Sequence, residues 1–157
     1  MTQTIAPAPV RRSVTLKTNP AHAFEVFTAG IGTWWPASHH IGASPLKLPI
    51  IEPKVGGRWY SISQDDSVCE IGKVLAWEPP GRLVLAWQLN GQFQYDPELI
   101  TEVEILFADQ GDGTTRVDLE HRHLERMGDT AEHGRAMVDA PNGWSLIMSL
   151  YQQAAEA

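Results

Sequence analysis

The chain has 157 residues and a mass of 17.4 kDa, with 43% hydrophobic and 20% charged residues. This balance is typical of one folded globular domain and excludes a disordered chain. A formal net charge of −7 argues against binding to a nucleic-acid backbone. The single cysteine, Cys69, excludes an internal disulfide, and no apolar run reaches the roughly 18 residues of a membrane span. We therefore expect a cytoplasmic protein with no membrane span and no nucleic-acid partner.

The first residues lack the features of a secretory signal, since they have no basic start and no continuous apolar stretch. Pro and Ala in this stretch offer little to bury, so we expect a flexible tail at residues 1–10. A single domain is then expected over residues 11–157. Alternating apolar and polar residues at 12–18 predict its first strand.

Asn19-Pro20 is a helix-start signal, with Asn as the N-cap and Pro at the first helical position. Apolar residues at positions 24, 26 and 27 predict a first short helix, and those at 31, 34 and 35 predict a second that ends at Pro36. The following residues, 36–50, show little periodicity. We interpret them as a surface loop, with a mobile lid as the alternative.

Turn residues separate further stretches of strand-like alternation, which predict an antiparallel meander of about six strands. These stretches are 59–62, 68–77, 82–89, 99–107 and 114–124. Residues 142–154 predict a C-terminal helix that starts after Pro141, because their apolar side chains fall on one face. We therefore predict an α+β fold, in which a curved antiparallel β-sheet wraps around a long C-terminal α-helix, with two short helices after the first strand. Such a sheet leaves a space between itself and the helix.

Two histidines follow the apolar positions of the last predicted strand. The even positions from 116 to 122 are charged and must face water, so His121 and His123 point inward if the pleat continues. If the strand instead ends near His121, both histidines lie at a solvated rim. In the preceding strand, Thr101 is the polar residue on the inward face.

A carboxylate beside an inward histidine would suit acid–base chemistry. Glu70 and His121 are the weak catalytic candidates of this kind. The hypothesis is that the two side chains pair inside the fold. Burial of Glu70 is costly unless the carboxylate is paired. The alternative is that Glu70 faces solvent.

The chain has six tryptophans, a residue that joins a large apolar body to a polar N–H group and often lines small-molecule pockets. The alternative for most of them is packing in the core. Aromatic side chains at the far end of the sheet and on the facing helix are the better pocket candidates. Together with the inward polar groups they form the predicted ligand site, which consists of Trp87, Phe93, Tyr95, Thr101, His121, Trp144 and Met148.

The sequence contains no strong catalytic or cofactor signature. Adjacent His39 and His40 would point to opposite sides of an extended segment and lack metal-ligand spacing, so we predict no metal site. The glycine turn at 111–113 is not followed by the helix of a phosphate loop, and no nucleophile elbow is present. Cys69 is interpreted as a structural thiol, and no cofactor is expected.

Several segments together resemble one known family. They are Phe24-x-x-Phe27-Thr28, Trp34-Trp35-Pro36, Gly56-Gly57-Arg58-Trp59-Tyr60, residues 72–83 followed by Trp87, Thr101-Glu102-Val103, residues 113–117 with His121, and Gly143-Trp144. In this order, over residues 10–155, the chain is similar to the family named for the activator of the heat-shock protein 90 ATPase. The resemblance implies the helix-grip fold of the superfamily that includes START lipid-transfer domains, pollen allergens and polyketide cyclases, with an apolar cavity between sheet and helix.

Three functions are compatible with these observations. The first is binding of a small apolar or aromatic molecule in the cavity between the sheet and the C-terminal helix. The second is an enzyme of cyclase or hydrolase type that acts on such a ligand, with His121 as its acid or base. The third is a protein-interaction or chaperone-regulator module, or a self-associating protein, whose acidic surface meets a basic partner.

Overall fold

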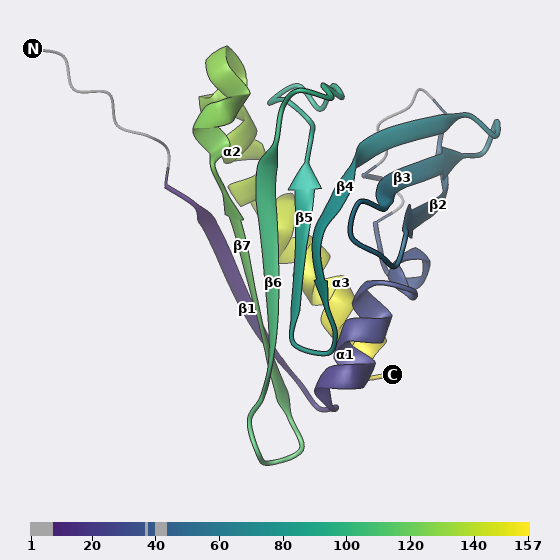
Figure 1. The fold of residues 1–157 in the computed structure, drawn as a ribbon, viewed down its shortest axis with the longest axis vertical. Coiled ribbons are helices and arrows are strands. Elements are labelled where there is room, and N and C mark those ends of the chain that lie inside the picture. Colours follow the sequence, from purple (N-terminus) through teal and green to yellow (C-terminus); the bar gives the residue numbers. More distant parts are fainter. Residues whose placement is uncertain (1–7, 37, 40–43) are drawn as a thin grey trace, which may run out of the picture.

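The computed structural model describes residues 8–36, 38–39 and 44–157. These residues form an antiparallel sheet of seven strands in the order β1-β7-β6-β5-β4-β3-β2 (Figure 1). The strands are β1 (Val10–Leu16), β2 (Leu46–Ile51), β3 (Arg58–Ser63), β4 (Val68–Glu78), β5 (Arg82–Trp87), β6 (Thr101–Asp109) and β7 (Thr115–Arg122). The sheet curls around the C-terminal helix α3 (Leu146–Ala155), which confirms the predicted α+β helix-grip fold.

Two short helical segments follow β1, as predicted. They are α1 (Pro20–Phe27) and a 3₁₀ turn, η1 (Ile31–Thr33). The side chain of Asn19 caps α1, since its Oδ1 accepts a hydrogen bond of 2.8 Å from the backbone N–H of His22. The second segment ends at Thr33, earlier than the expected end at Pro36.

Alternate residues of β6 and β7 face the core, as the periodicity of the sequence predicts. The buried positions run from Thr101 to Phe107 on β6 and from Thr115 to His121 on β7. α3 buries Met148 in the same core, where a large apolar side chain contributes about 1.5–3 kcal/mol of stability. This packing places the cavity described below between the sheet and the C-terminal helices.

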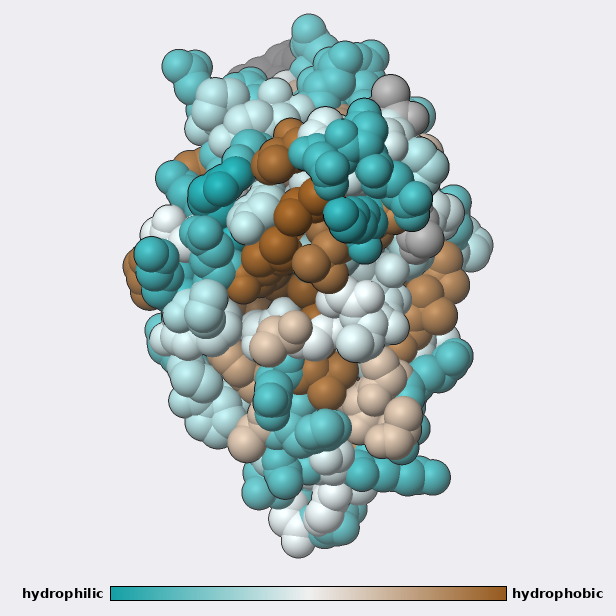
Figure 2. Space-filling model, turned by 90° about the vertical axis from the view of Figure 1, so that its right-hand side faces the viewer, coloured by the Kyte–Doolittle hydropathy of each residue, from teal (hydrophilic) through white to brown (hydrophobic). Residues whose placement is uncertain are grey.

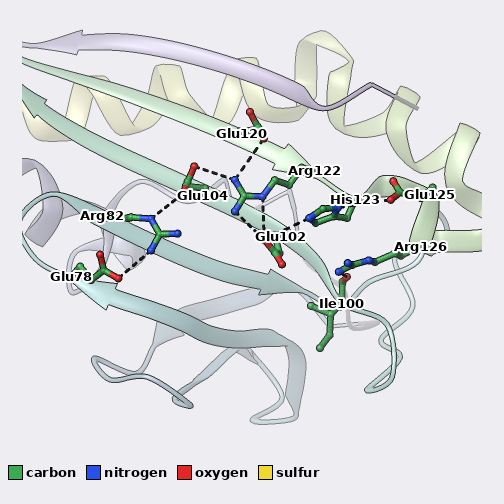
Figure 3. Close-up of polar contacts among 10 residues, drawn as sticks. All are labelled: Glu78, Arg82, Ile100, Glu102, Glu104, Glu120, Arg122, His123, Glu125 and Arg126. Carbon is green, nitrogen blue, oxygen red and sulfur yellow. Dashed lines mark hydrogen bonds and ion pairs between the residues drawn. The ribbon is translucent and has the colours of Figure 1, made fainter. Parts of the chain in front are cut away.

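The outer face of the sheet carries a ladder of ion pairs (Figure 3). The guanidinium of Arg122 on β7 donates to Glu102 and Glu104 on β6. Arg82 on β5 donates to Glu104 from the other side and to Glu78 on β4. Burial acts to raise the pKa of Glu104, but the hydrogen bonds from the two arginines outweigh it and lower that pKa. The ladder therefore links four neighbouring strands.

The predicted strands lie within two residues of their expected bounds, but β1 is shifted and β2 was not expected. β1 begins at Val10 rather than at residue 12, because Val10 is buried and pairs with His121. The expected loop at 36–50 contains the first residues of β2, an edge strand whose Pro49 is tolerated because an edge needs fewer backbone donors. Residues 1–7 of the predicted tail lie outside the described residues, and so do residues 37 and 40–43 of the predicted loop or lid.

The C-terminal helix is preceded by two helical segments that the sequence pattern did not predict, η2 (Leu124–Thr130) and α2 (Ala131–Asp139). The helix expected over residues 142–154 begins as a wide turn, η3 (Pro141–Ser145), which joins α2 to α3. At Gly143 the backbone leaves the helical region, with φ −86° and ψ −131°. A Cβ atom at this position would lie 2.3 Å from the carbonyl oxygen of Val138. Glycine is therefore required at the break between α2 and α3.

Three further expectations concern membranes, metals and the cysteine. No helix in the described ranges has the length and apolar character needed to cross a membrane. Within the same ranges, no three His, Cys, Asp or Glu side chains gather closely enough to hold a metal ion. Cys69 on β4 is a half-buried free thiol.

Candidate functional site

A cavity of about 220 Å³ lies between the sheet and the junction of α2 with α3. Figure 2 shows a hollow with hydrophobic walls on one side of the molecule. Most of the side chains around the cavity are apolar or aromatic, and the polar ones come from two short segments. The lining residues are Trp35, Ser38, His39, Ile71, Trp87, Leu89, Phe93, Met137, Val138, Asn142, Gly143, Trp144 and Ile147.

Four aromatic rings from separate parts of the chain form much of the wall. Trp87 ends β5 and packs edge-to-face on Trp144, with ring centroids 5.6 Å apart. Phe93, from the connection between β5 and β6, lies 6.4 Å from Trp87, and Trp35 lies 6.4 Å from Trp144. Edge-to-face contacts of this kind stabilise the rings beyond simple burial. The wall is therefore assembled by the tertiary fold rather than by one local motif.

Phe93 is held at this wall by an unusual backbone conformation. Its φ of 59° lies in the left-handed region, which a bulky residue rarely adopts. Asn90 supports this conformation, since its carbonyl oxygen accepts from the Phe93 N–H at 2.9 Å. The Oδ1 of Asn90 also accepts from the N–H groups of Gln92 and Gln94, at 2.9 and 3.0 Å. This local network holds the backbone at Phe93 in its left-handed conformation.

The polar part of the lining is centred on His39. Its Nε2 lies 2.6 Å from the carbonyl oxygen of Asn142, which can only accept, so Nε2 carries a proton. In the neutral imidazole, Nδ1 then accepts from the hydroxyl of Ser38 at 3.0 Å. The indole N–H of Trp35 donates to the backbone carbonyl of His39 at 3.2 Å. These contacts hold the segment after η1 against the break between α2 and α3.

His121 does not line the cavity but lies behind its aromatic wall. Its Nδ1 accepts from the indole N–H of Trp144 at 3.1 Å, and its Nε2 contacts the Thr101 hydroxyl at 2.8 Å. That hydroxyl donates to the carbonyl of Trp87 at 2.9 Å, so it accepts from Nε2–H. Complete burial lowers the pKa of His121 to about 3. The imidazole is therefore neutral, with its proton on Nε2.

The structure places the seven predicted ligand-site residues in three environments. Trp87, Phe93 and Trp144 line the cavity. Thr101, His121 and Met148 are buried next to the aromatic wall or in the adjoining core, and Tyr95 is 41% exposed on the connection between β5 and β6; these four do not line it.

The hypothesised pair of Glu70 and His121 does not form. Glu70 accepts hydrogen bonds from the guanidinium of Arg58, and its side chain is partly exposed. His123 does not point inward either, because β7 ends at Arg122 and His123 adopts a left-handed φ of 63°. Its ring is 38% exposed and lies 3.9 Å from the carboxylate of Glu102. The rim alternative therefore holds for His123 and the solvent-facing alternative for Glu70.

Several lining residues were not recognised from the sequence. Ser38 and His39 lie in a stretch without periodicity, and Asn142 contributes its backbone carbonyl. Trp35 belongs to the Trp-Trp-Pro segment, whose pattern predicts a helix rather than a cavity wall. No local pattern indicates that these residues meet, because their contact depends on the approach of two distant segments.

The fold and its cavity define a helix-grip protein of the START-like class. A model of the family described as "Activator of Hsp90 ATPase homolog 1-like protein" matches residues 17–153, and the chain belongs to this family. The resemblance recognised in the sequence is thereby confirmed. No curated protein matches the chain.

Solved structures are similar over nearly the whole chain. An anthrahydroquino-γ-pyrone synthase, solved as a complex, has 36% identity and a TM-score of 0.65, covering 93% of this chain and 96% of that one. CalC, a self-sacrificing resistance protein from Micromonospora echinospora, has 32% identity and a TM-score of 0.67, covering 94% and 93%. A protein from Nitrosomonas europaea with 13% identity and a TM-score of 0.67, covering 98% and 97%, shares the fold.

Proposed function

We propose that this protein binds a small aromatic molecule in the cavity between the sheet and the α2–α3 junction. The observation that carries the proposal is the convergence of Trp35, Trp87, Phe93 and Trp144 around one cavity with a polar group at one side. Apolar walls with a few placed polar groups are typical of small-molecule sites.

The size of the cavity limits the ligand. Drug-sized molecules occupy cavities of roughly 300–1,000 Å³, whereas benzene fits an engineered cavity of about 150 Å³. A cavity of about 220 Å³ therefore suits one or two fused rings. A larger ring system would require the walls to move apart.

The comparisons support an aromatic ligand. One relative with 36% identity is named for a product that contains a fused ring system, an anthrahydroquino-γ-pyrone. That name also keeps an enzymatic role as the second candidate function. His121 does not suit the acid–base role in it, because both ring nitrogens are occupied and burial lowers its pKa to about 3. Such chemistry would have to use groups that face the cavity.

Binding can be tested with 2-naphthol as the probe, by thermal unfolding and by calorimetric titration. A ligand at about 100 times its Kd stabilises the folded state by about 2.7 kcal/mol, which raises the Tm by about 5–10 °C for a chain of this length. Val138 lines the cavity from α2, so Val138→Phe should fill part of it and weaken binding at least tenfold.

The control is Leu106→Phe, which adds an aromatic ring on the outer face of β6 and should leave the Kd unchanged. The Tm without probe shows whether each variant folds. If Val138→Phe does not fold, Ile147→Phe fills the cavity from α3 instead. An unchanged Kd in a folded, cavity-filled variant, or no binding to the unmodified protein, would overturn the proposal.

A further inference from the structure

His39 is the only titratable side chain among the described residues that line the cavity. It lies in the connection between η1 and β2, and it reaches the break between α2 and α3. Its ring is half-buried, with one nitrogen bonded to the Ser38 hydroxyl and the other to a backbone carbonyl. This arrangement puts one hydrogen-bond donor and one acceptor side by side in an otherwise largely apolar lining.

The two groups have complementary roles. The Nε2–H of His39 is a donor, and the carbonyl oxygen of Asn142 is an acceptor. A hydroxyl group can accept from the first and donate to the second at the same time. A methyl ether could accept from His39 but would leave the carbonyl without a donor. A hydrocarbon could do neither.

We infer that His39 selects ring systems that carry a phenolic hydroxyl, and that this hydroxyl inserts between His39 Nε2 and the Asn142 carbonyl. The inference rests on the proposed function, since it needs the aromatic ring to lie in the cavity. Insertion exchanges one protein hydrogen bond for two bonds to the ligand, so the net gain is that of about one hydrogen bond. In affinity this corresponds to about 3–10-fold.

Three matched probes test the inference, namely 2-naphthol, 2-methoxynaphthalene and 2-methylnaphthalene. Their Kd values are measured by calorimetric titration of the unmodified protein into each probe. We expect 2-naphthol to bind about 3–10-fold more tightly than the other two, which should be similar to each other. His39→Leu should reduce this preference to about onefold, because the side chain loses its N–H donor.

Two control variants separate the role of His39 from a general effect. His133→Leu removes an exposed imidazole of α2 that does not line the cavity, and it should retain the full preference. His39→Gln keeps a side-chain N–H donor and should retain part of the preference. It also provides a second test if His39→Leu does not fold.

The outcomes distinguish this inference from the proposed function. If the unmodified protein binds all three probes equally, or if folded His39→Leu keeps the preference for 2-naphthol, the role of His39 is overturned and the aromatic cavity stands. If 2-methoxynaphthalene binds as tightly as 2-naphthol, insertion as both donor and acceptor is overturned. If none of the probes binds, the proposed function fails together with the inference.

Discussion

His121 is held in one protonation state by Trp144, which also lines the cavity, and by the buried Thr101. The indole N–H of Trp144 points at Nδ1, so a second proton on that nitrogen would have no acceptor. The Thr101 hydroxyl, which already donates to the carbonyl of Trp87, accepts the hydrogen bond from Nε2–H. Protonation of His121 must therefore break a contact that positions one of the two tryptophans.

We expect the free energy of unfolding to decrease as the pH falls below 6.5. The pKa of His121 is about 3 in the folded protein and near 6.5 in the unfolded chain. Below pH 6.5 the unfolded state therefore binds more protons and becomes favoured. The free energy of unfolding then falls by at most about 1.4 kcal/mol per pH unit, which amounts to about 2 kcal/mol by pH 5. Urea unfolding at pH 7, 6 and 5 measures it.

The comparison of two histidines isolates this contribution. His121→Phe removes the buried titration and should flatten the dependence of stability on pH, even though the variant is less stable at pH 7. His133→Phe, on an exposed position of α2, should keep the dependence of the unmodified protein. The same slope in His121→Phe and in the unmodified protein would contradict the assignment.

The junction of α2 and α3 is the element that gives the cavity its shape. Arg12 on β1 fastens it from the edge of the sheet, because its guanidinium donates to the carbonyl and the carboxylate of Asp139, at 3.1 and 2.8 Å. Its Nε donates to the hydroxyl of Ser145 at 2.8 Å. The hydrogen bond from Arg12 also lowers the pKa of Asp139, which keeps this carboxylate charged. One side chain thus contacts both sides of the helix break.

Arg12→Ala should destabilise the protein by about 1–2 kcal/mol, since it removes three hydrogen bonds to the junction from a side chain that is 25% exposed. The neighbouring Arg11→Ala is the matched control. Arg11 is 71% exposed and contacts Glu120, so its loss should cost less than about 0.5 kcal/mol. Urea midpoints of the two variants check the difference, and equal values would show that the junction does not depend on Arg12.

At the scale of the whole molecule, the two faces of the sheet have different tasks. The inner face surrounds the core and the cavity, while the outer face carries the charged ladder centred on Arg122 (Figure 3). Arg122 is 23% exposed and contacts three carboxylates, those of Glu102, Glu104 and Glu120. Among the described residues of the outer face, Arg122 is the arginine with the most ion-pair partners.

Arg122→Leu should therefore destabilise the protein by about 1–2 kcal/mol at neutral pH, because it leaves partly buried carboxylates without a counter-charge. The control is Arg116→Leu on the same strand. Arg116 is 55% exposed and contacts Asp118, so a change below about 0.5 kcal/mol is expected. Chemical unfolding at neutral pH compares the two, and a loss no greater for Arg122→Leu than for Arg116→Leu would contradict the prediction.

Much of the architecture could be read from local patterns. The alternation in β6 and β7 identified the inward positions from Thr101 to His121, and Asn19-Pro20 marked the start of α1. α2 could not be predicted because its buried residues, such as Gly134, give a weak apolar pattern. β2 was missed because it is a short edge strand that contains a proline.

The candidate site was predictable to a smaller extent. The sequence identified Trp87 and Trp144 as aromatic groups near the end of the sheet and on the covering helix. Periodicity also showed that His121 points inward, but it could not show that these two tryptophans lie between His121 and the cavity. His39 and Asn142 could not be paired from the sequence, because 103 positions separate them.

The contact between His39 and Asn142 uses a main-chain oxygen at position 142 and a side chain at position 39. Any amino acid at position 142 would supply the same oxygen, whereas Gly143 is constrained by the close approach of Val138. A scan of single substitutions would then report tolerance at position 142 and intolerance at its neighbour. A protein of this fold could thus keep one half of its polar pair while the residue that provides it changes freely over evolution.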